Sequence, residues 1–224
     1  MKLREDLEKY FHNSNESVLL TEILMGIVVL QYTFRMEPIS IFEIIISVVS
    51  GLYLADLKSG LNHLYFDTYT GNGETRRQLA SLFLHHHENP RDVIDNTIDI
   101  HLRWSSVPLL PLICVLYNLT PLTSKSQILF QISSLFGTHF QYEFHKYAHL
   151  TNILTNEQKQ KPEYKLMMFL QDIRLILHPN EHHPHHASEK HDRNFCIVNG
   201  WANPLLNSIV HIPFIHSRLF PDDM

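Results

Sequence analysis

Several chemistries are disfavoured by what this sequence has little of. Cysteine occurs only at Cys114 and Cys196, and neither lies in a Cys-x-x-Cys pair. This argues against a disulfide framework, an iron–sulfur cluster and thiolate chemistry. The sequence also has no glycine-rich phosphate loop and no serine nucleophile elbow. Basic residues are not in excess either, since the formal net charge is -5. We therefore expect no nucleic-acid partner.

Histidine, in contrast, is abundant, with 17 residues in 224. The densest stretch runs from His178 to His191 and holds six histidines in fourteen residues. Within it, His185 and His186 follow His182 by three and four positions, which places all three on one face of a helix. Neutral imidazole is a common ligand for transition metals. A surface tract of solvated or metal-scavenging histidines is the alternative interpretation of this stretch alone.

Apolar residues are segregated into two regions. Residues 18–57 predict a first transmembrane hairpin, with a buried hairpin of a soluble bundle as the alternative, and residues 107–141 predict a second, transmembrane or re-entrant hairpin. Lysine and arginine concentrate in the N-terminal arm 1–17, the segment 58–106 and the cap 142–224, which we expect on the cytosolic side. The predicted fold is therefore an all-α integral membrane protein with about four such helices and a cytosolic helical cap.

Four histidine groups fall on that same predicted side. They are His63 with Asp67, the run His85–His87, the pair His145 and His149, and the dense stretch described above. Any one of them alone could be ordinary polar surface, but together they predict one multi-histidine site with two adjacent metal ions. Imidazole suits zinc, copper, iron and nickel alike. A hydrolytic zinc site needs about three protein ligands, so the excess of histidine favours oxygen activation by iron at a lipid chain.

At this point the sequence resembles the Kua-type lipid desaturases, which include plasmanylethanolamine desaturases and a plastid phosphatidylglycerol desaturase. The similar segments lie between about residues 51 and 207: Gly60-Leu-Asn-His63-Leu-Tyr-Phe-Asp67, His86-His87-Glu-Asn-Pro90, His145-Lys-Tyr-Ala-His149, Gln171-Asp172, His182-x-x-His185-His186 and Phe195-Cys-Ile-Val-Asn-Gly200-Trp201. Their histidine forms are closer to the plasmanylethanolamine branch. Departures include Pro184 inside the last histidine box and Glu143 where the family usually carries glutamine.

The resemblance implies a helical membrane enzyme with a di-iron centre. It would use O2 and electrons from a carrier such as cytochrome b5 or ferredoxin to form the vinyl ether of a phospholipid, in the endoplasmic reticulum of a eukaryote or the inner membrane of a bacterium. The implied iron ligands are His63, His86, His87, His145, His149, His182, His185 and His186, with Asp67 and Asp172 orienting them. An acyl-lipid desaturase, a lipid hydroxylase and, more distantly, a histidine-rich metal transporter are the alternatives.

Overall fold

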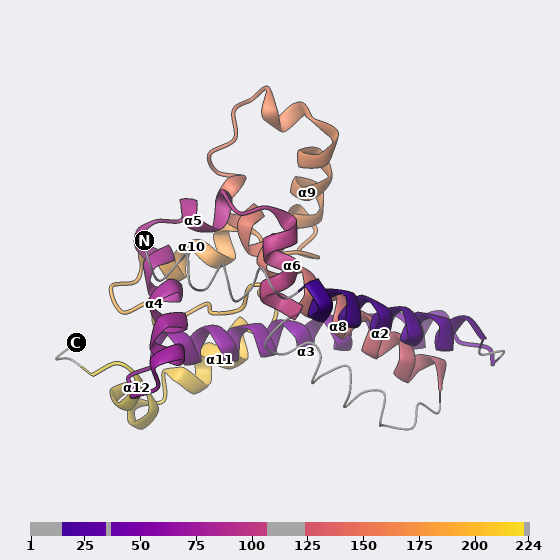
Figure 1. Cartoon of the computed structure of the whole chain (residues 1–224), viewed down its shortest axis with the longest axis horizontal. Helices are drawn as coiled ribbons and strands as arrows, with labels where there is room; N and C mark the ends of the chain where they lie inside the picture. The colour runs from indigo at the N-terminus through magenta and orange to yellow at the C-terminus, as the bar shows by residue number, and fades with distance from the viewer. Residues whose placement is uncertain (1–14, 35–36, 107–123, 222–224) are drawn as a thin grey trace. The chain divides into compact units, whose positions relative to one another are not determined.

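The computed structural model describes residues 15–34, 37–106 and 124–221, and every regular element among them is helical (Figure 1). The all-α prediction is therefore confirmed for these residues. The chain divides into two compact units, a first unit of residues 1–55 and 97–142 and a second unit of residues 56–96 and 143–224. Two long helices contribute to both units, α3 (Ile41–Asp67) and α8 (Lys125–Leu150).

The first unit also contains α2 (Asn15–Phe34) and α6 (Ile98–Ser106). Helix α3 begins with a reciprocal cap. The Glu43 amide donates to the Ser40 hydroxyl oxygen at 3.2 Å, and the Ser40 amide donates to the Glu43 carboxylate at 2.9 Å. Val28 of α2 packs against Ile128 and Leu135 of α8 to form a small buried core.

Apart from its parts of α3 and α8, the second unit consists of short helices: α4 (Glu74–Glu88), α5 (Arg91–Ile94), the 3₁₀ turn η1 (Gln158–Gln160), α9 (Pro162–Asp172), α10 (Pro179–Ala187), α11 (Asn203–Val210) and α12 (Pro213–Leu219). The last four helices each carry proline in the first turn, where its fixed φ suits a helix and its missing N–H costs nothing.

A buried carboxylate organises the loop that precedes α11. Asp56 of α3 accepts hydrogen bonds from the backbone amides of Val198, Asn199, Gly200 and Ala202 at 2.9–3.1 Å. One turn later, α3 approaches this loop closely at Gly60, where a Cβ atom would lie 2.5 Å from the Cys196 sulfur. This segment of the chain is therefore bound tightly to the half of α3 that carries His63 and Asp67.

The predicted membrane hairpins are not supported by the described residues. Within those residues, no helix combines the length and apolarity expected of a membrane span. The first predicted hairpin ends at residue 57, whereas α3 continues to Asp67 through polar residues such as Asn62 and His63. Residues 107–123 of the second predicted hairpin lie outside the described ranges, and the rest of it forms the start of α8.

Candidate metal centre

Helices α3, α4, α8 and α10 bring all eight predicted histidines together inside the second unit. Their metal-binding atoms form two groups, and within each group these atoms lie within 4.8 Å of one another. The five-histidine group is His86, His145, His149, His182 and His186, and the mixed group is His63, Asp67, His87 and His185. The residues were predicted as one ligand set, and the structure shows how that set divides.

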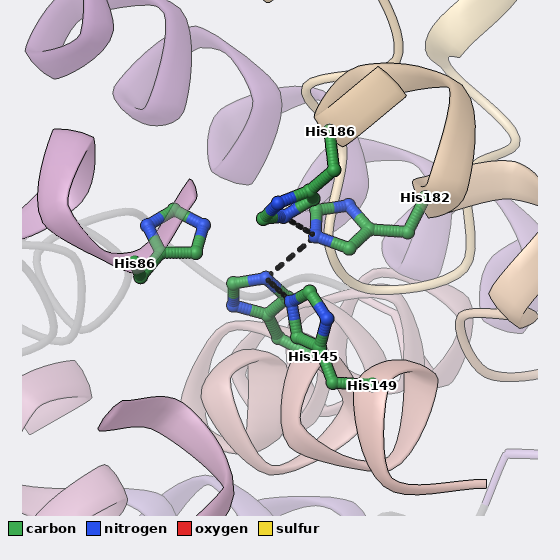
Figure 2. A group of neighbouring side chains, drawn as sticks. All are labelled: His86, His145, His149, His182 and His186. Carbon is green, nitrogen blue, oxygen red and sulfur yellow. Dashed lines mark hydrogen bonds between the residues drawn. The ribbon is translucent and has the colours of Figure 1, made fainter. Parts of the chain in front are cut away.

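Helical spacing explains the five-histidine group. His145 and His149 lie one turn apart on α8, and His182 and His186 lie one turn apart on α10. Figure 2 shows these two pairs facing each other, with His86 of α4 approaching from another side. The Nε2 atoms of His145 and His182 are 2.7 Å apart, so the two helices present their imidazoles to one shared point.

Hydrogen bonding alone does not satisfy these nitrogen atoms. The Nε2 atom of His145 lies 3.1 Å from that of His149 and 2.7 Å from that of His182. The Nε2 atom of His182 also lies 2.9 Å from that of His186. An imidazole nitrogen carries either one proton or one lone pair. The central nitrogen atoms therefore cannot complete both contacts as hydrogen bonds, whereas a cation at the shared point accepts all the lone pairs at once.

The mixed group is built around Asp67, which lies at the end of α3. Its carboxylate oxygens are 3.5 Å from His63 Nε2, 3.7 Å from His87 Nε2 and 3.4 Å from His185 Nε2. Both carboxylate oxygens and His63 Nε2 are buried without a hydrogen-bond partner. Buried polar atoms without partners are costly, so this donor set fits a bound cation. Asp67 was predicted to orient ligands, but the structure places it among the candidate ligands themselves.

Backbone carbonyls fix the orientation of two histidines in the mixed group. His63 Nδ1 donates to the Phe195 carbonyl at 3.1 Å, and His185 Nδ1 donates to the Arg193 carbonyl at 2.8 Å. Because the Nδ1 atoms carry the protons, each Nε2 atom keeps a lone pair that faces Asp67. The segment around Phe195 thus holds ligand candidates in position.

Burial keeps the imidazoles neutral. It is the main cause that lowers the pKa of His149, His185 and His186 to about 3 and that of His87 to about 2, and nearby histidines add to the effect. The pKa values of the other four are lowered well below 6.5 for the same reason. Burial also raises the pKa of Asp67 well above its usual range, and a positive ion nearby would stabilise the charged form of that carboxylate.

Other predicted or unassigned residues lie apart from the two groups. Asp172 is exposed at the end of α9 and belongs to neither group. Its neighbour Gln171 is buried instead, accepting from the Thr151 hydroxyl at 2.9 Å and donating to the Leu177 carbonyl at 3.0 Å. This side chain links the end of α8 to the approach of α10, a role that spacing alone did not reveal. The ring centroid of His191 lies 4.1 Å from that of His87, with the two rings tilted by 35°, but His191 belongs to neither group.

Helix α10 runs through Pro184, the residue that departs from the family pattern inside the last histidine box. The helix begins at Pro179, and His178 caps it by accepting a hydrogen bond from the Asn180 amide at 3.0 Å. Pro184 therefore costs one backbone hydrogen bond within a short helix. The histidines His182 and His185, on either side of Pro184 in α10, are buried.

A buried cluster of convergent side chains between helices is the arrangement by which helical proteins hold one or two metal ions in their core. Two comparisons make the class specific. A family model described as a lipid desaturase domain matches residues 52–215. Mouse plasmanylethanolamine desaturase 1 is 31% identical over 177 residues, an alignment that covers 71% of this chain and 59% of the mouse protein. No solved structure matches the chain. The chain belongs to the lipid desaturase family, and both candidate ligand groups lie inside the matched region.

Proposed function

We propose that the protein is a di-iron lipid desaturase and that the five-histidine and mixed groups hold its two iron ions. The observation that carries the proposal is the buried convergence of eight neutral imidazoles and one carboxylate within a lipid desaturase domain. Iron bound there would supply the activation of O2. Imidazole binds several transition metals, so the family is what favours iron over zinc or copper.

The proposed reaction removes one hydrogen from each of two adjacent carbons of a lipid chain. With O2, two electrons and two protons it yields a carbon–carbon double bond and two waters. The electrons come from an external carrier such as cytochrome b5 or ferredoxin. The similarity to mouse plasmanylethanolamine desaturase 1 supports an ether phospholipid as the substrate and a vinyl ether as the product.

The protein's own groups have separable roles in this proposal. The carbonyls of Phe195 and Arg193 hold His63 and His185 in the tautomer that binds metal. The negative charge of the Asp67 carboxylate would partly neutralise the positive charge of the bound ions. Burial of the imidazoles excludes water, which protects reactive species from side reactions.

The first unit presents an apolar surface suited to a lipid environment. Large apolar side chains are exposed along α2 and the start of α3, among them Phe34 at 78%, Ile41 at 71% and Phe42 at 68%. Apolar patches of this extent are uncommon on proteins that are surrounded by water. They support the proposal that the protein works at a membrane, in the endoplasmic reticulum or a bacterial inner membrane.

The test is lipid analysis of plasmalogen-deficient cells that contain plasmanyl lipids and express the protein. Wild type is compared with His145→Ala and with His183→Ala, which changes an exposed histidine outside both groups. We expect acid-labile vinyl ethers with wild type and His183→Ala but not with His145→Ala. Well-expressed, iron-loaded protein that forms no vinyl ether would refute the ether-lipid substrate, and new double bonds in acyl chains would identify an acyl-lipid desaturase instead.

A further inference from the structure

A third cluster of metal-binding side chains lies in the second unit, and the proposed reaction does not use it. Asp192 follows α10, His211 caps the end of α11, and His216 lies in α12. Their metal-binding atoms lie within 4.8 Å of one another, and none of the three belongs to the groups described above. No pattern of close spacing in the sequence connects Asp192 to the two histidines.

The Asp192 carboxylate is held so that its two oxygens have different partners. Oδ1 accepts hydrogen bonds from the Ser188 hydroxyl at 2.7 Å and from Arg193 Nε at 3.3 Å. Oδ2 faces both histidines, at 3.0 Å from His216 Nε2 and 3.5 Å from His211 Nε2. Oδ1 is thus committed to fixing the carboxylate, while Oδ2 and two ring nitrogens meet at one place.

These distances suit a tetrahedral divalent ion. Zinc binds histidine nitrogen and carboxylate oxygen at about 2.0–2.2 Å, so neighbouring ligand atoms of a tetrahedral site lie roughly 3.4 Å apart. The two separations involving Asp192, 3.0 and 3.5 Å, lie on either side of that value. A carboxylate–histidine hydrogen bond accounts for the contact with His216, whereas His211 Nε2 lies 3.5 Å from the same oxygen, a distance that fits either an ion pair or a shared metal ion.

The cluster is open to solvent on one side. Both histidines line a cavity of about 420 Å³, together with Pro213, Ser217, Phe220 and Pro221. The side chains of His211 and His216 are 40% and 28% exposed, whereas that of Asp192 is 11% exposed. An ion can therefore enter from the cavity, and a water molecule has room to complete its coordination.

We propose that Asp192, His211 and His216 form a separate binding site for a divalent transition ion of the zinc class. Three protein ligands with water in the fourth position make a recognised zinc arrangement. Here the ion would fasten the end of α11 and helix α12 to the segment that follows α10, and so stabilise the fold around the larger centre. The site does not depend on the identity of the metal or the substrate in that centre.

The test counts zinc ions bound to the purified full-length protein, first stripped with chelator and then titrated with Zn²⁺. Wild type is compared with His211→Gln and Asp192→Asn. The control is His85→Ala. Exposed His85 also contacts an aspartate, Asp92, at 2.6 Å, but this pair belongs to none of the candidate metal-binding groups. We expect each of the first two variants to lose one equivalent of zinc relative to wild type, and the control to lose none.

A second measurement covers the case in which a variant folds poorly. Zinc should raise the unfolding temperature of wild type and of His85→Ala by more than it raises that of Asp192→Asn, which keeps the shape of the side chain. Circular dichroism verifies helical content, and the iron content measured before the chelator treatment verifies that the larger centre is intact. Equal zinc stoichiometry and equal thermal shifts in all four proteins would show that the cluster is only an ion pair, and the proposal would fail.

Discussion

The sharpest test of the fold is the replacement of Asp56, whose carboxylate accepts four backbone amides from residues 198–202. Asp56 itself is fully buried, as are Val198 and Ala202. In Asp56→Ala, all four N–H groups lose their acceptor and little water can replace it. Each buried donor left unpaired costs about 1–3 kcal/mol, so we expect Asp56→Ala to lower the free energy of unfolding by about 4 kcal/mol or more.

Asp56→Asn gives a graded comparison. An asparagine oxygen can still accept from Val198, Asn199 and Gly200, which all donate to Oδ1 at 2.9–3.1 Å. Its amide nitrogen would face the Ala202 amide, which donates to Oδ2 at 2.9 Å. One donor is then unpaired, and we expect a loss of about 1–3 kcal/mol.

The assay is denaturant unfolding of the purified protein, followed by circular dichroism. Asp95→Ala serves as the control because Asp95 is exposed, and a change of that kind usually alters stability by less than about 0.5 kcal/mol. If Asp56→Ala unfolds at the same denaturant concentration as Asp95→Ala, the carboxylate does not hold this loop. If Asp56→Asn is as damaging as Asp56→Ala, negative charge rather than the number of accepted hydrogen bonds is what stabilises it.

Three further predictions follow from packing and burial. Gly60→Ala should lower the free energy of unfolding by about 1–3 kcal/mol through overpacking, because the added Cβ would lie 2.5 Å from the Cys196 sulfur. The control in the same denaturant unfolding assay is Gly26→Ala, whose Cβ would have no atom within 4 Å. Gln171→Ala should cost about 1–3 kcal/mol because it leaves the buried Leu177 carbonyl unpaired, and a denaturation midpoint equal to wild type would contradict this. Metal-free protein should become less stable as the pH falls below 6.5. The histidines of the unfolded chain then bind protons, whereas the buried histidines of the folded protein, with pKa values of about 3, stay neutral. At one pH unit below 6.5 this costs about 1.4 kcal/mol per histidine, and a flat pH profile of unfolding would refute it.

The candidate ligands were predictable because helical spacing is a local property of the sequence. His145 and His149, like His182 and His186, lie one turn apart, and the structure brings both pairs to one point. How the set divides was not predictable. His86 and His87 are neighbours in the chain but enter different groups, because the facing helices decide which group each imidazole joins.

Long-range contacts account for what the sequence did not reveal. Asp56 contacts a loop more than 140 residues later, and such a pairing has no periodicity to signal it. The apolar run of the first predicted hairpin ends at residue 57, before the end of α3 at Asp67.

The division of neighbouring histidines between two groups has a consequence for metal loading. Helix α4 carries His86 of the five-histidine group and His87 of the mixed group. Helix α10 carries His182 and His186 of the five-histidine group and His185 of the mixed group. An ion bound in either group therefore fixes two helices that also carry ligands of the other, which lowers the ordering cost of the second binding event. If both groups bind iron as proposed, uptake should accordingly be cooperative, with a Hill coefficient approaching about 2, the number of sites. Protein carrying a single iron ion should be scarce at half saturation.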